Sequence, residues 1–191
     1  KGIQTRMVAV IGLDIKKIED ILKKNITKDE NLCETANDNC PGQVILSGTK
    51  KGLELISDEL KDSGARSIID LNVSAPFHCS LMNPASEIMA KTLAKIDIKK
   101  PDTNFISNVS ADFENDPKKI KKLLVDQVYS RVKWRESINR ISDLNIKRVI
   151  EIGSGKVLTG LNKRIGLQKD YSNVSDALDI NRFLQDYESL L

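Results

Sequence analysis

The stretch Met7-Val8-Ala9-Val10-Ile11-Gly12 is the first of the segments that decide the fold. Its unbroken apolar run, rich in Val and Ile, is typical of a buried strand, and the glycine ends the run. Asp14 is a good helix cap, and the apolar residues after it recur at helical spacing: Ile15, Ile18, Ile21 and Leu22. A strand that passes directly into an amphipathic helix predicts a protein of mixed α/β class.

The pattern continues to residue 73 and predicts a small subdomain over residues 7–73. The elements expected after the first helix are an extended segment over Glu34–Asn39, a strand over Gln43–Ser47, a helix over Lys50–Ser63 and a strand over Ile68–Val73. Thr49 is expected to cap the second helix and Gly64 to end it. The order strand-helix-strand-strand-helix-strand is the signature of a ferredoxin-like subdomain.

Residues 74–191 show a different pattern, in which strands alternate with helices. An amphipathic helix is expected through Leu81, Ala85, Ile88, Met89, Leu93 and Ile96, followed by a strand over Thr103–Ser107, helices over Pro117–Tyr129 and Trp134–Leu144, a strand over Lys147–Ile152, a helix over Lys156–Ile165, a strand over Tyr171–Val174 and a helix through Phe183 and Leu190. Such alternation predicts a parallel sheet. Three short strands make a poor sheet by themselves, so we expect this half to lack partner strands. The stripe that contains Met82 and Met89 is expected to be core.

Composition excludes some classes of partner. The chain has 191 residues, enough for one domain or two small ones. Hydrophobic residues make up 40% and aromatic residues only 4%, so Ile, Leu and Val must form the core. The net charge of +3 is too small to predict nucleic-acid binding, and few rings are present to stack on bases.

The three cysteines and the absence of apolar spans bear on the compartment. Cys33, Cys40 and Cys79 are odd in number and lack C-x-x-C spacing, which indicates a reducing compartment with neither structural disulfides nor a metal site. No apolar run is long enough to cross a membrane and no signal peptide is visible, so we expect a cytoplasmic protein without a membrane partner. The start at Lys1 lacks a methionine, which favours a piece of a longer chain.

The single histidine, His78, lies between an expected strand and an expected helix. Histidine is the residue type best suited to proton transfer near neutral pH, so catalysis is one interpretation and an ordinary surface or N-cap-region histidine is the other. Cys79 is adjacent, but neighbouring residues point in different directions and a Cys/His dyad normally joins distant positions. We interpret Cys79 as a small residue at a helix start, with a Cys79-based hydrolase as a weaker alternative.

The segment Gly153-Ser154-Gly155-Lys156 looks like the end of a phosphate-binding loop but does not fit one. Ile150 stands where the motif requires a glycine, and Val157 stands where it requires Ser or Thr. The sequence therefore predicts only a tight strand-to-helix turn, whose N–H groups face either a ligand or water.

Four stretches together resemble a known family. They are Met7–Leu13 (MVAVIGL), Asn37–Gly48 (NDNCPGQVILSG), Ala75–Met82 (APFHCSLM) and Glu151–Leu161 (EIGSGKVLTGL). In order and spacing they are similar to segments of the C-terminal part of bacterial malonyl-CoA:acyl-carrier-protein transacylases, with Ser154 in place of the usual proline. The resemblance covers essentially the whole chain.

The resemblance implies a fold and a set of roles. The fold is a ferredoxin-like subdomain plus part of an α/β-hydrolase-like acyltransferase domain, here residues 74–191. The reaction is a ping-pong transfer of malonyl from coenzyme A to the phosphopantetheine thiol of acyl carrier protein in fatty acid synthesis. His78 would be the acid–base residue, held by the main-chain carbonyl of Gln127. Asn37 and Asn39 would line the substrate channel, and Phe77 would disfavour methylmalonyl.

The resemblance also implies no permanently bound cofactor, with the coenzyme A thioester as substrate and acyl carrier protein as partner. The sequence departs from the family because its serine elbow, oxyanion-hole glutamine and carboxylate-binding arginine all lie before the equivalent of Met7. No G-x-S-x-G motif occurs in these residues. We therefore expect the chain to be inactive alone. Its missing partner is either the N-terminal segment of the same enzyme or a separate polypeptide that carries those residues. The alternative is a noncatalytic module that binds carrier protein or coenzyme A.

Overall fold

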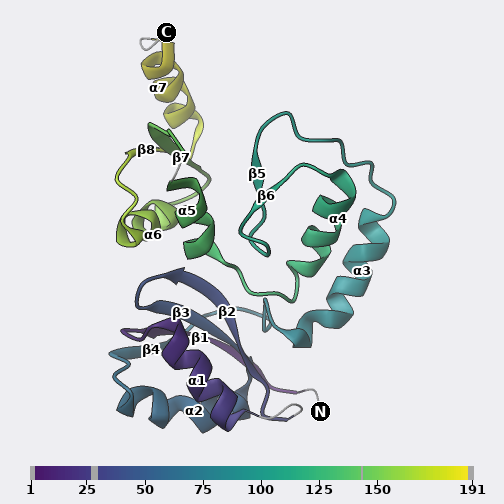
Figure 1. The fold of residues 1–191 in the computed structure, drawn as a ribbon, viewed down its shortest axis with the longest axis vertical. Coiled ribbons are helices and arrows are strands. Elements are labelled where there is room, and N and C mark those ends of the chain that lie inside the picture. Colours follow the sequence, from purple (N-terminus) through teal and green to yellow (C-terminus); the bar gives the residue numbers. More distant parts are fainter. Residues whose placement is uncertain (1–2, 27–29, 143, 189–191) are drawn as a thin grey trace. The chain divides into compact units, whose positions relative to one another are not determined.

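The computed structural model describes residues 3–26, 30–142 and 144–188 of the chain. The chain forms two compact units, Lys1–Ser137 and Ile138–Leu191, which are described separately (Figure 1). The expected division after residue 73 falls inside the first unit and stays a prediction.

The first unit contains a four-stranded antiparallel sheet. Its strands are β1 (Thr5–Ile11), β2 (Cys33–Cys40), β3 (Gln43–Thr49) and β4 (Ser67–Asp70), in the spatial order β2-β3-β1-β4. The two helices are α1 (Ile15–Asn25), between β1 and β2, and α2 (Lys50–Asp62), between β3 and β4. The ferredoxin-like subdomain is confirmed, including the extended segment near Cys33.

The helix starts follow from local capping. The carboxylate of Asp14 accepts a hydrogen bond from the N–H of Lys16 at 2.9 Å, and this bond lowers the pKa of Asp14. The hydroxyl of Thr49 accepts one from the N–H of Gly52 at 3.0 Å. Each bond satisfies a donor that the first turn of a helix leaves unpaired, an effect worth about 1 kcal/mol.

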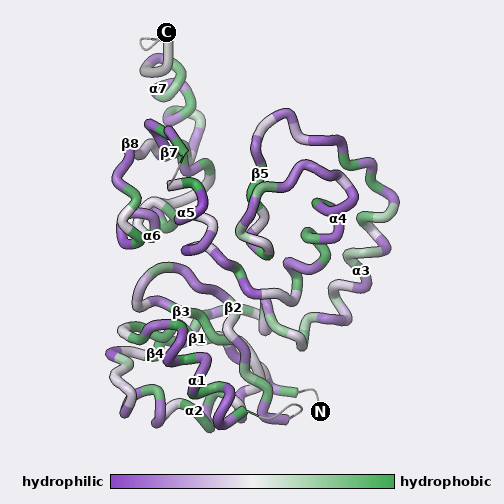
Figure 2. Tube along the Cα trace, viewed as in Figure 1, coloured by the Kyte–Doolittle hydropathy of each residue, from purple (hydrophilic) through white to green (hydrophobic). Residues whose placement is uncertain are grey.

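The core of this subdomain lies between the sheet and the two helices. It contains thirteen buried residues: Val8, Val10, Leu13, Ile15, Ile18, Ile21, Leu22, Cys33, Val44, Leu46, Leu53, Ile56 and Leu60. Figure 2 shows the apolar strands β1 and β3, and apolar and polar residues alternating along α1 and α2. Burying one aliphatic side chain of this kind is worth about 1.5–3 kcal/mol, so the cluster stabilises the packing of both helices on the sheet.

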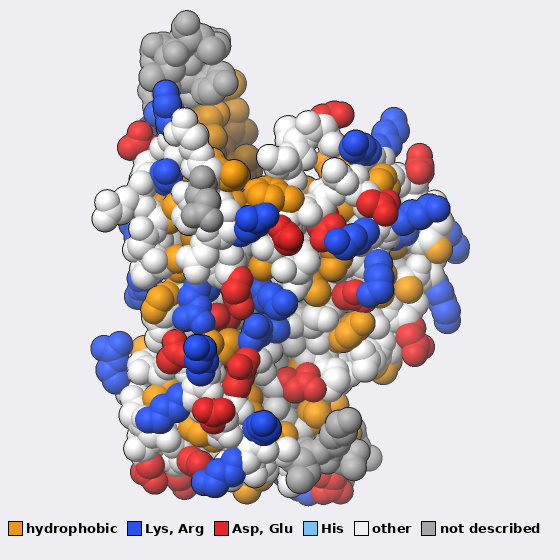
Figure 3. All heavy atoms as spheres, in the orientation of Figure 1, with side chains coloured by type: hydrophobic (Ala, Val, Ile, Leu, Met, Phe, Trp, Pro, Cys, Tyr) orange, Lys and Arg blue, Asp and Glu red, His pale blue; other side chains and the backbone are white. Residues whose placement is uncertain are grey.

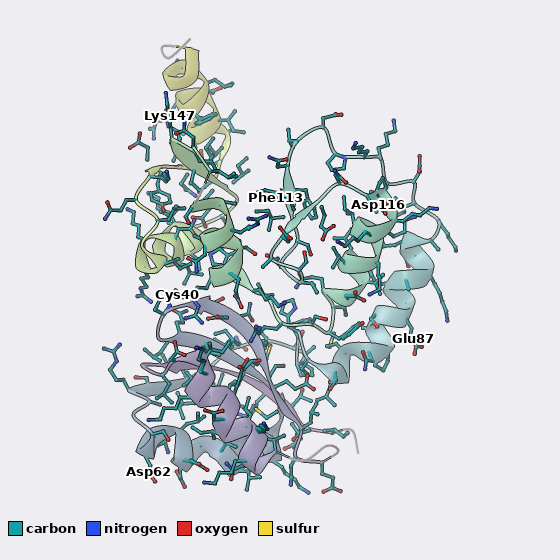
Figure 4. All side chains as sticks on the ribbon, in the orientation of Figure 1. Cys40, Asp62, Glu87, Phe113, Asp116 and Lys147 are labelled. Atoms are coloured by element: carbon teal, nitrogen blue, oxygen red, sulfur yellow. The ribbon has the colours of Figure 1, made fainter. Side chains whose placement is uncertain are left out.

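The rest of the first unit carries shorter elements. They are η1 (Ser80–Met82), α3 (Asn83–Leu93), β5 (Phe105–Ile106), β6 (Phe113–Glu114) and α4 (Pro117–Asp126). Figure 4 labels Glu87 on α3, Phe113 on β6 and Asp116, whose carboxylate caps α4 through the N–H of Lys118 at 2.9 Å. The start of α4 is thus capped by Asp116, and the helix ends at Asp126.

Two expectations for this region are wrong. The strand predicted over Thr103–Ser107 is shorter and pairs antiparallel with β6 in a hairpin, not in a parallel sheet. The backbone returns through a turn in which Ala111 adopts φ 54°. The stripe on α3 is not core, because Met89 is 40% exposed and Ile88 is 67% exposed. The helix packs mainly against α4, which covers only one of its faces.

The second unit contains a parallel strand pair. Its elements are β7 (Arg148–Ile152), α6 (Val157–Ile165), β8 (Asp170–Val174) and α7 (Ala177–Glu188), while α5 (Trp134–Ser142) spans the division between the units. β7 and β8 pair in parallel, from Arg148 opposite Asp170 to Ile152 opposite Val174, as predicted for these two strands. Ile150 is 40% and Ile152 81% exposed. The final helix is present, although Leu190 lies outside the described residues.

Candidate functional site

His78 lies in the loop between β4 and η1, within the first unit. Its φ is 60°, in the left-handed region that residues with a side chain rarely adopt. Such conformations persist only where surrounding contacts hold them, and they concentrate at functional sites. His78 is therefore held in an unusual geometry at the position that the sequence singled out.

The imidazole of His78 is bound to the main chain at the end of α4. Its Nδ1 lies 2.8 Å from the carbonyl oxygen of Gln127. A carbonyl oxygen can only accept a hydrogen bond, so Nδ1 carries the proton in the neutral ring and Nε2 keeps a lone pair. A bond of this kind is worth about 1 kcal/mol, which favours the Nδ1–H tautomer roughly fivefold.

The side chain of Gln127 also approaches the ring, with its Nε2 atom 3.2 Å from Nδ1 of His78. Two donors cannot share one bond, and the positions of amide O and N in a glutamine are assigned from the hydrogen-bond network. The main-chain contact is shorter and has a fixed acceptor, so it determines which nitrogen of His78 is protonated.

The end of α4 explains why this carbonyl is available. The helix was expected to continue to Tyr129 but ends at Asp126, with Gln127 as its C-cap. The last carbonyls of a helix have no partner within the helix. The carbonyl of Gln127, the cap residue, contacts the His78 ring, and the oxygen of Val128, one residue beyond the cap, accepts a long bond from the N–H of His78 at 3.3 Å.

β2 carries Asn37 and Asn39, the two residues expected to line a channel. The strand pairs with β3 through two irregularities, between Thr35 and Asn37 and between Asp38 and Cys40. Bulges of this kind redirect side chains and are common beside functional sites. The outer edge of β2 meets Val132, which donates to the Ala36 oxygen at 2.8 Å and accepts from the Asp38 N–H at 2.9 Å.

The predicted site residues fall into two groups, those in contact with each other and those without a contact that assigns a role. His78 and Gln127 are in direct contact. Phe77 precedes His78 and is 38% exposed, while both asparagines are half-buried on β2. Their proposed roles toward a substrate stay predictions.

A buried ion pair on β2 was not predicted. One Asp38 oxygen lies 2.7 Å from Nη2 of Arg135, and the Asp38 side chain is 1% exposed. Burial raises the pKa of Asp38, and the guanidinium opposes that rise. Arg135 also lies 3.5 Å from the Asp14 carboxylate. The pair ties the start of α5 to β2.

Glu34, also on β2, was not among the site residues predicted from the sequence either. Its carboxylate accepts two hydrogen bonds from Ser80, one from the N–H at 2.8 Å and one from the hydroxyl at 2.7 Å. No local sequence signal links these positions, which are 46 residues apart.

Cys79 does not have the environment of a nucleophile. Its side chain is fully buried, and its thiol donates to the Pro76 oxygen at 3.1 Å. Burial raises the pKa of Cys79, which keeps it protonated at neutral pH. The interpretation of Cys79 as a structural residue is therefore favoured over a Cys79-based hydrolase.

The turn at Gly153–Gly155, in the second unit, is closed by a carboxylate. Glu151 accepts hydrogen bonds from the N–H of Leu158 at 3.0 Å and of Thr159 at 2.8 Å. Desolvation raises the pKa of Glu151, but hydrogen bonds from Thr159 and from the Leu158 N–H outweigh it and lower the pKa overall. These donors at the start of α6 are bound to the protein itself.

The described ranges contain neither a metal-binding cluster nor a membrane-spanning helix. Residues 3–26, 30–142 and 144–188 contain no cluster of three or more His, Cys, Asp or Glu suited to a metal ion. No helix in the same ranges is both long and apolar enough to cross a membrane. Figure 3 shows basic and acidic side chains interspersed on the surface.

Comparison with known proteins gives a consistent family likeness. No protein-family model matches the chain. The malonyl CoA-acyl carrier protein transacylase of Bacillus subtilis (strain 168) is 43% identical over 179 residues, which are 94% of this chain and 56% of that protein. This chain thus spans somewhat more than half the length of that relative.

Solved structures show the same family likeness as the sequence comparison. The acyl-carrier-protein-S-malonyltransferase from Bartonella henselae superposes with a TM-score of 0.88 at 41% identity, covering 97% of this chain and 59% of that one. A type II PKS acyl-carrier protein in complex with its malonyl-transacylase matches with a TM-score of 0.88 at 33% identity, covering 96% and 59%. The resemblance drawn from the four sequence stretches is confirmed, and the fold is that of these malonyltransferases over the part that the chain spans.

Proposed function

We propose that this chain is the histidine-bearing part of a malonyl-CoA:acyl-carrier-protein transacylase, because it is similar to such enzymes over 94% of its length. The observation that carries the proposal is the 2.8 Å contact between Nδ1 of His78 and the Gln127 oxygen. A general base needs one ring nitrogen held and the other available for the reacting proton. The geometry of His78 meets that requirement.

In the proposed reaction, the other reacting group is the serine of a nucleophile elbow, a motif that these 191 residues do not contain. Nε2 of His78 takes the serine proton while the serine oxygen attacks the thioester carbonyl of malonyl-CoA. The tetrahedral intermediate collapses, the C–S bond breaks, and the imidazolium protonates the departing thiolate. The product of this half-reaction is a malonyl-serine ester and free coenzyme A.

The second half-reaction runs the same steps with a new thiol. The phosphopantetheine thiol of a carrier protein gives its proton to Nε2 and attacks the malonyl ester. The intermediate expels the serine oxygen, which recovers its proton from His78. Throughout, the Gln127 carbonyl accepts from Nδ1–H and stabilises the imidazolium that forms twice per cycle. No permanently bound cofactor takes part.

The substrate and partner assignments are the finer part of the proposal. Malonyl and carrier protein are supported by the names of the similar enzymes and by the solved carrier-protein complex. Asn37 and Asn39 are proposed to line the channel for the phosphopantetheine arm. Phe77 is proposed to narrow the acyl site against an α-methyl branch. A cytoplasmic setting, as for soluble fatty acid synthesis, belongs to the same proposal.

The test is malonyl transfer by the complete gene product that carries these residues. His78→Ala should lower the transfer rate by about 10²–10⁴-fold, since that is the usual worth of acid–base assistance. His78→Gln should lose activity similarly, because its amide cannot take a proton. Glu87→Gln on α3, which alters an exposed carboxylate, is the matched control. Near-normal transfer by His78→Ala would remove His78 from the mechanism.

A second candidate is a noncatalytic module that binds carrier protein or coenzyme A. It is favoured by one observation, the absence of a serine elbow from these residues. Titration of the 191-residue chain with acyl carrier protein distinguishes the candidates. Saturable binding by a protein that shows no malonyl transfer would favour the module, and no saturable binding of carrier protein or coenzyme A would rule it out.

A further inference from the structure

The loop that carries His78 needs an external support. His78 adopts φ 60°, which costs free energy in any residue with a side chain. The N–H of His78 makes only a long bond of 3.3 Å to the Val128 oxygen. The ring contact with Gln127 fixes the imidazole but does not by itself fix the backbone from which the ring projects.

Glu34 provides a two-point contact to this loop from β2. One carboxylate oxygen accepts the Ser80 hydroxyl at 2.7 Å, and the other accepts the Ser80 N–H at 2.8 Å. Ser80 begins η1, and the residue before it, Cys79, makes no side-chain cap. Glu34 therefore satisfies the first donor of η1 from a different part of the chain. Hydrogen bonds to a charged acceptor are the stronger kind.

The same strand also holds the partner of the ring. β2 pairs with Val132, and Asp38 on β2 binds Arg135, so the segment that follows Gln127 is tied to β2 as well. The segment that carries His78 and the segment that follows Gln127 are thus both bonded to β2. On the histidine side the tie is the bond between Glu34 and Ser80, with the buried Cys79 between Ser80 and His78.

We propose that Glu34 is a positioning residue for His78: its carboxylate fixes Ser80, and through it the left-handed backbone that presents the imidazole to Gln127. The inference rests on the proposed function for its catalytic consequence, but its structural part concerns His78 alone. Without the carboxylate the loop samples other conformations, and the Nδ1–H bond to the Gln127 oxygen is made part of the time. Glu34 acts through Ser80 and touches no substrate.

The first readout is the ring itself. His78 is the only histidine, so ¹⁵N–¹H correlation spectra of the 191-residue chain report its tautomer without ambiguity. In Glu34→Gln, the Nδ1–H fraction should fall clearly below that of the unchanged chain, because the neutral amide keeps one acceptor oxygen where the carboxylate offers Ser80 two charged ones. Ser80→Ala, which removes only the hydroxyl bond, should give a smaller shift in the same direction. Glu54→Gln, an exposed carboxylate on α2, is the matched control and should leave the spectrum unchanged.

The second readout is malonyl transfer by the complete protein. Glu34→Gln should lower kcat by about 10- to 100-fold with little change in KM for malonyl-CoA, the usual effect of a small displacement of a catalytic group. The double variant Glu34→Gln with Ser80→Ala should lower kcat little more than Glu34→Gln alone, because both substitutions act on the same contact between Glu34 and Ser80.

The outcomes separate this inference from the proposed function. If Glu34→Gln lowers only the melting temperature and leaves the His78 tautomer and kcat unchanged, Glu34 is merely structural and the inference is overturned. Additive effects of the two substitutions would also overturn it. If His78→Ala transfers malonyl normally, the proposed function fails; a shifted tautomer in Glu34→Gln would still support the positioning role.

Discussion

Nδ1 of His78 lies 2.8 Å from the main-chain oxygen of Gln127, a residue 49 positions further along the chain. In Ser-His-Asp triads a carboxylate contacts Nδ1 of the histidine. In this chain Nδ1 of His78 contacts a neutral main-chain carbonyl at the end of a helix. The carbonyl oxygen can only accept a hydrogen bond, so it orients the ring and leaves Nε2 with the lone pair that the proposed mechanism needs. The following predictions test this arrangement and the scaffold around it.

Acyl selectivity should depend on Phe77, which lies beside His78 in the chain and is 38% exposed. In the complete protein, Phe77→Ala should raise the ratio of kcat/KM for methylmalonyl-CoA to that for malonyl-CoA by roughly tenfold or more, because crowding of one methyl group is worth about 1–3 kcal/mol. Leu55→Ala, at an exposed position on α2, is the control. An unchanged ratio in Phe77→Ala would remove Phe77 from the acyl site.

Stability should depend unequally on the two partners of the buried ion pair. Arg135→Met leaves the Asp38 carboxylate buried without its cation and should lower the free energy of unfolding by about 3 kcal/mol at pH 7. Asp38→Asn leaves a guanidinium that is partly exposed and still near Asp14, so its cost should be smaller. Denaturant unfolding followed by the fluorescence of Trp134, the single tryptophan, measures both.

The cost of Arg135→Met should also depend on pH. Burial raises the pKa of Asp38 and Arg135 opposes the rise, so loss of Arg135 raises this pKa further. A carboxyl with a raised pKa in the folded state costs stability as pH rises above its unfolded value of about 3.9. The difference between Arg135→Met and the unchanged chain should therefore shrink as pH falls from 7 toward 4. Arg182→Met, which breaks an exposed pair with Asp179, should show no comparable trend.

The part of the fold that local signals determine could be predicted from the sequence. Asp14 and Thr49 cap the expected helices, and the apolar spacing of α1 and α2 matches their buried faces. The pairing of β5 was mispredicted because it depends on a partner strand that only the hairpin turn supplies. The burial of Asp38 was also missed, because two bulges in β2 break the alternation from which a buried face is read.

The candidate site likewise contains residues that the sequence predicts and residues that it does not. His78 stood out as the only histidine, and the family motif supplied Gln127 as its partner. Glu34 and Arg135 act through contacts between residues far apart in sequence, and no periodicity or motif marks such pairs. They become visible only when β2, the histidine loop and the start of α5 are placed together.

The three thiols should be unreactive in the folded chain. Cys40 and Cys79 are fully buried and Cys33 is 3% exposed, and burial raises the pKa of both Cys33 and Cys79. Iodoacetamide at pH 8 should therefore label none of them within the time that labels all three in denaturant, as counted by mass spectrometry. Rapid labelling of Cys79 in the native chain would contradict its structural role.

The carboxylate of Glu151 should stabilise the start of α6. Its pKa is lowered in the folded chain, so its contribution is present above its ordinary pKa and is lost as pH falls through the lowered value. Glu151→Gln should cost about 1 kcal/mol at pH 7, as for loss of a helix cap, and the difference should vanish well below about pH 4. Thermal unfolding across pH measures this, with Asp170→Asn, an exposed carboxylate on β8, as the control.

The tautomer of His78 tests the central claim most directly. Long-range ¹⁵N–¹H spectra of the chain, recorded over a pH titration, assign the protonated nitrogen of the one imidazole. The account predicts that the neutral ring is predominantly protonated at Nδ1, the atom 2.8 Å from the Gln127 oxygen, with Nε2 carrying the lone pair. A neutral ring protonated mainly at Nε2 would contradict it, because His78 would then have no base to offer a serine hydroxyl.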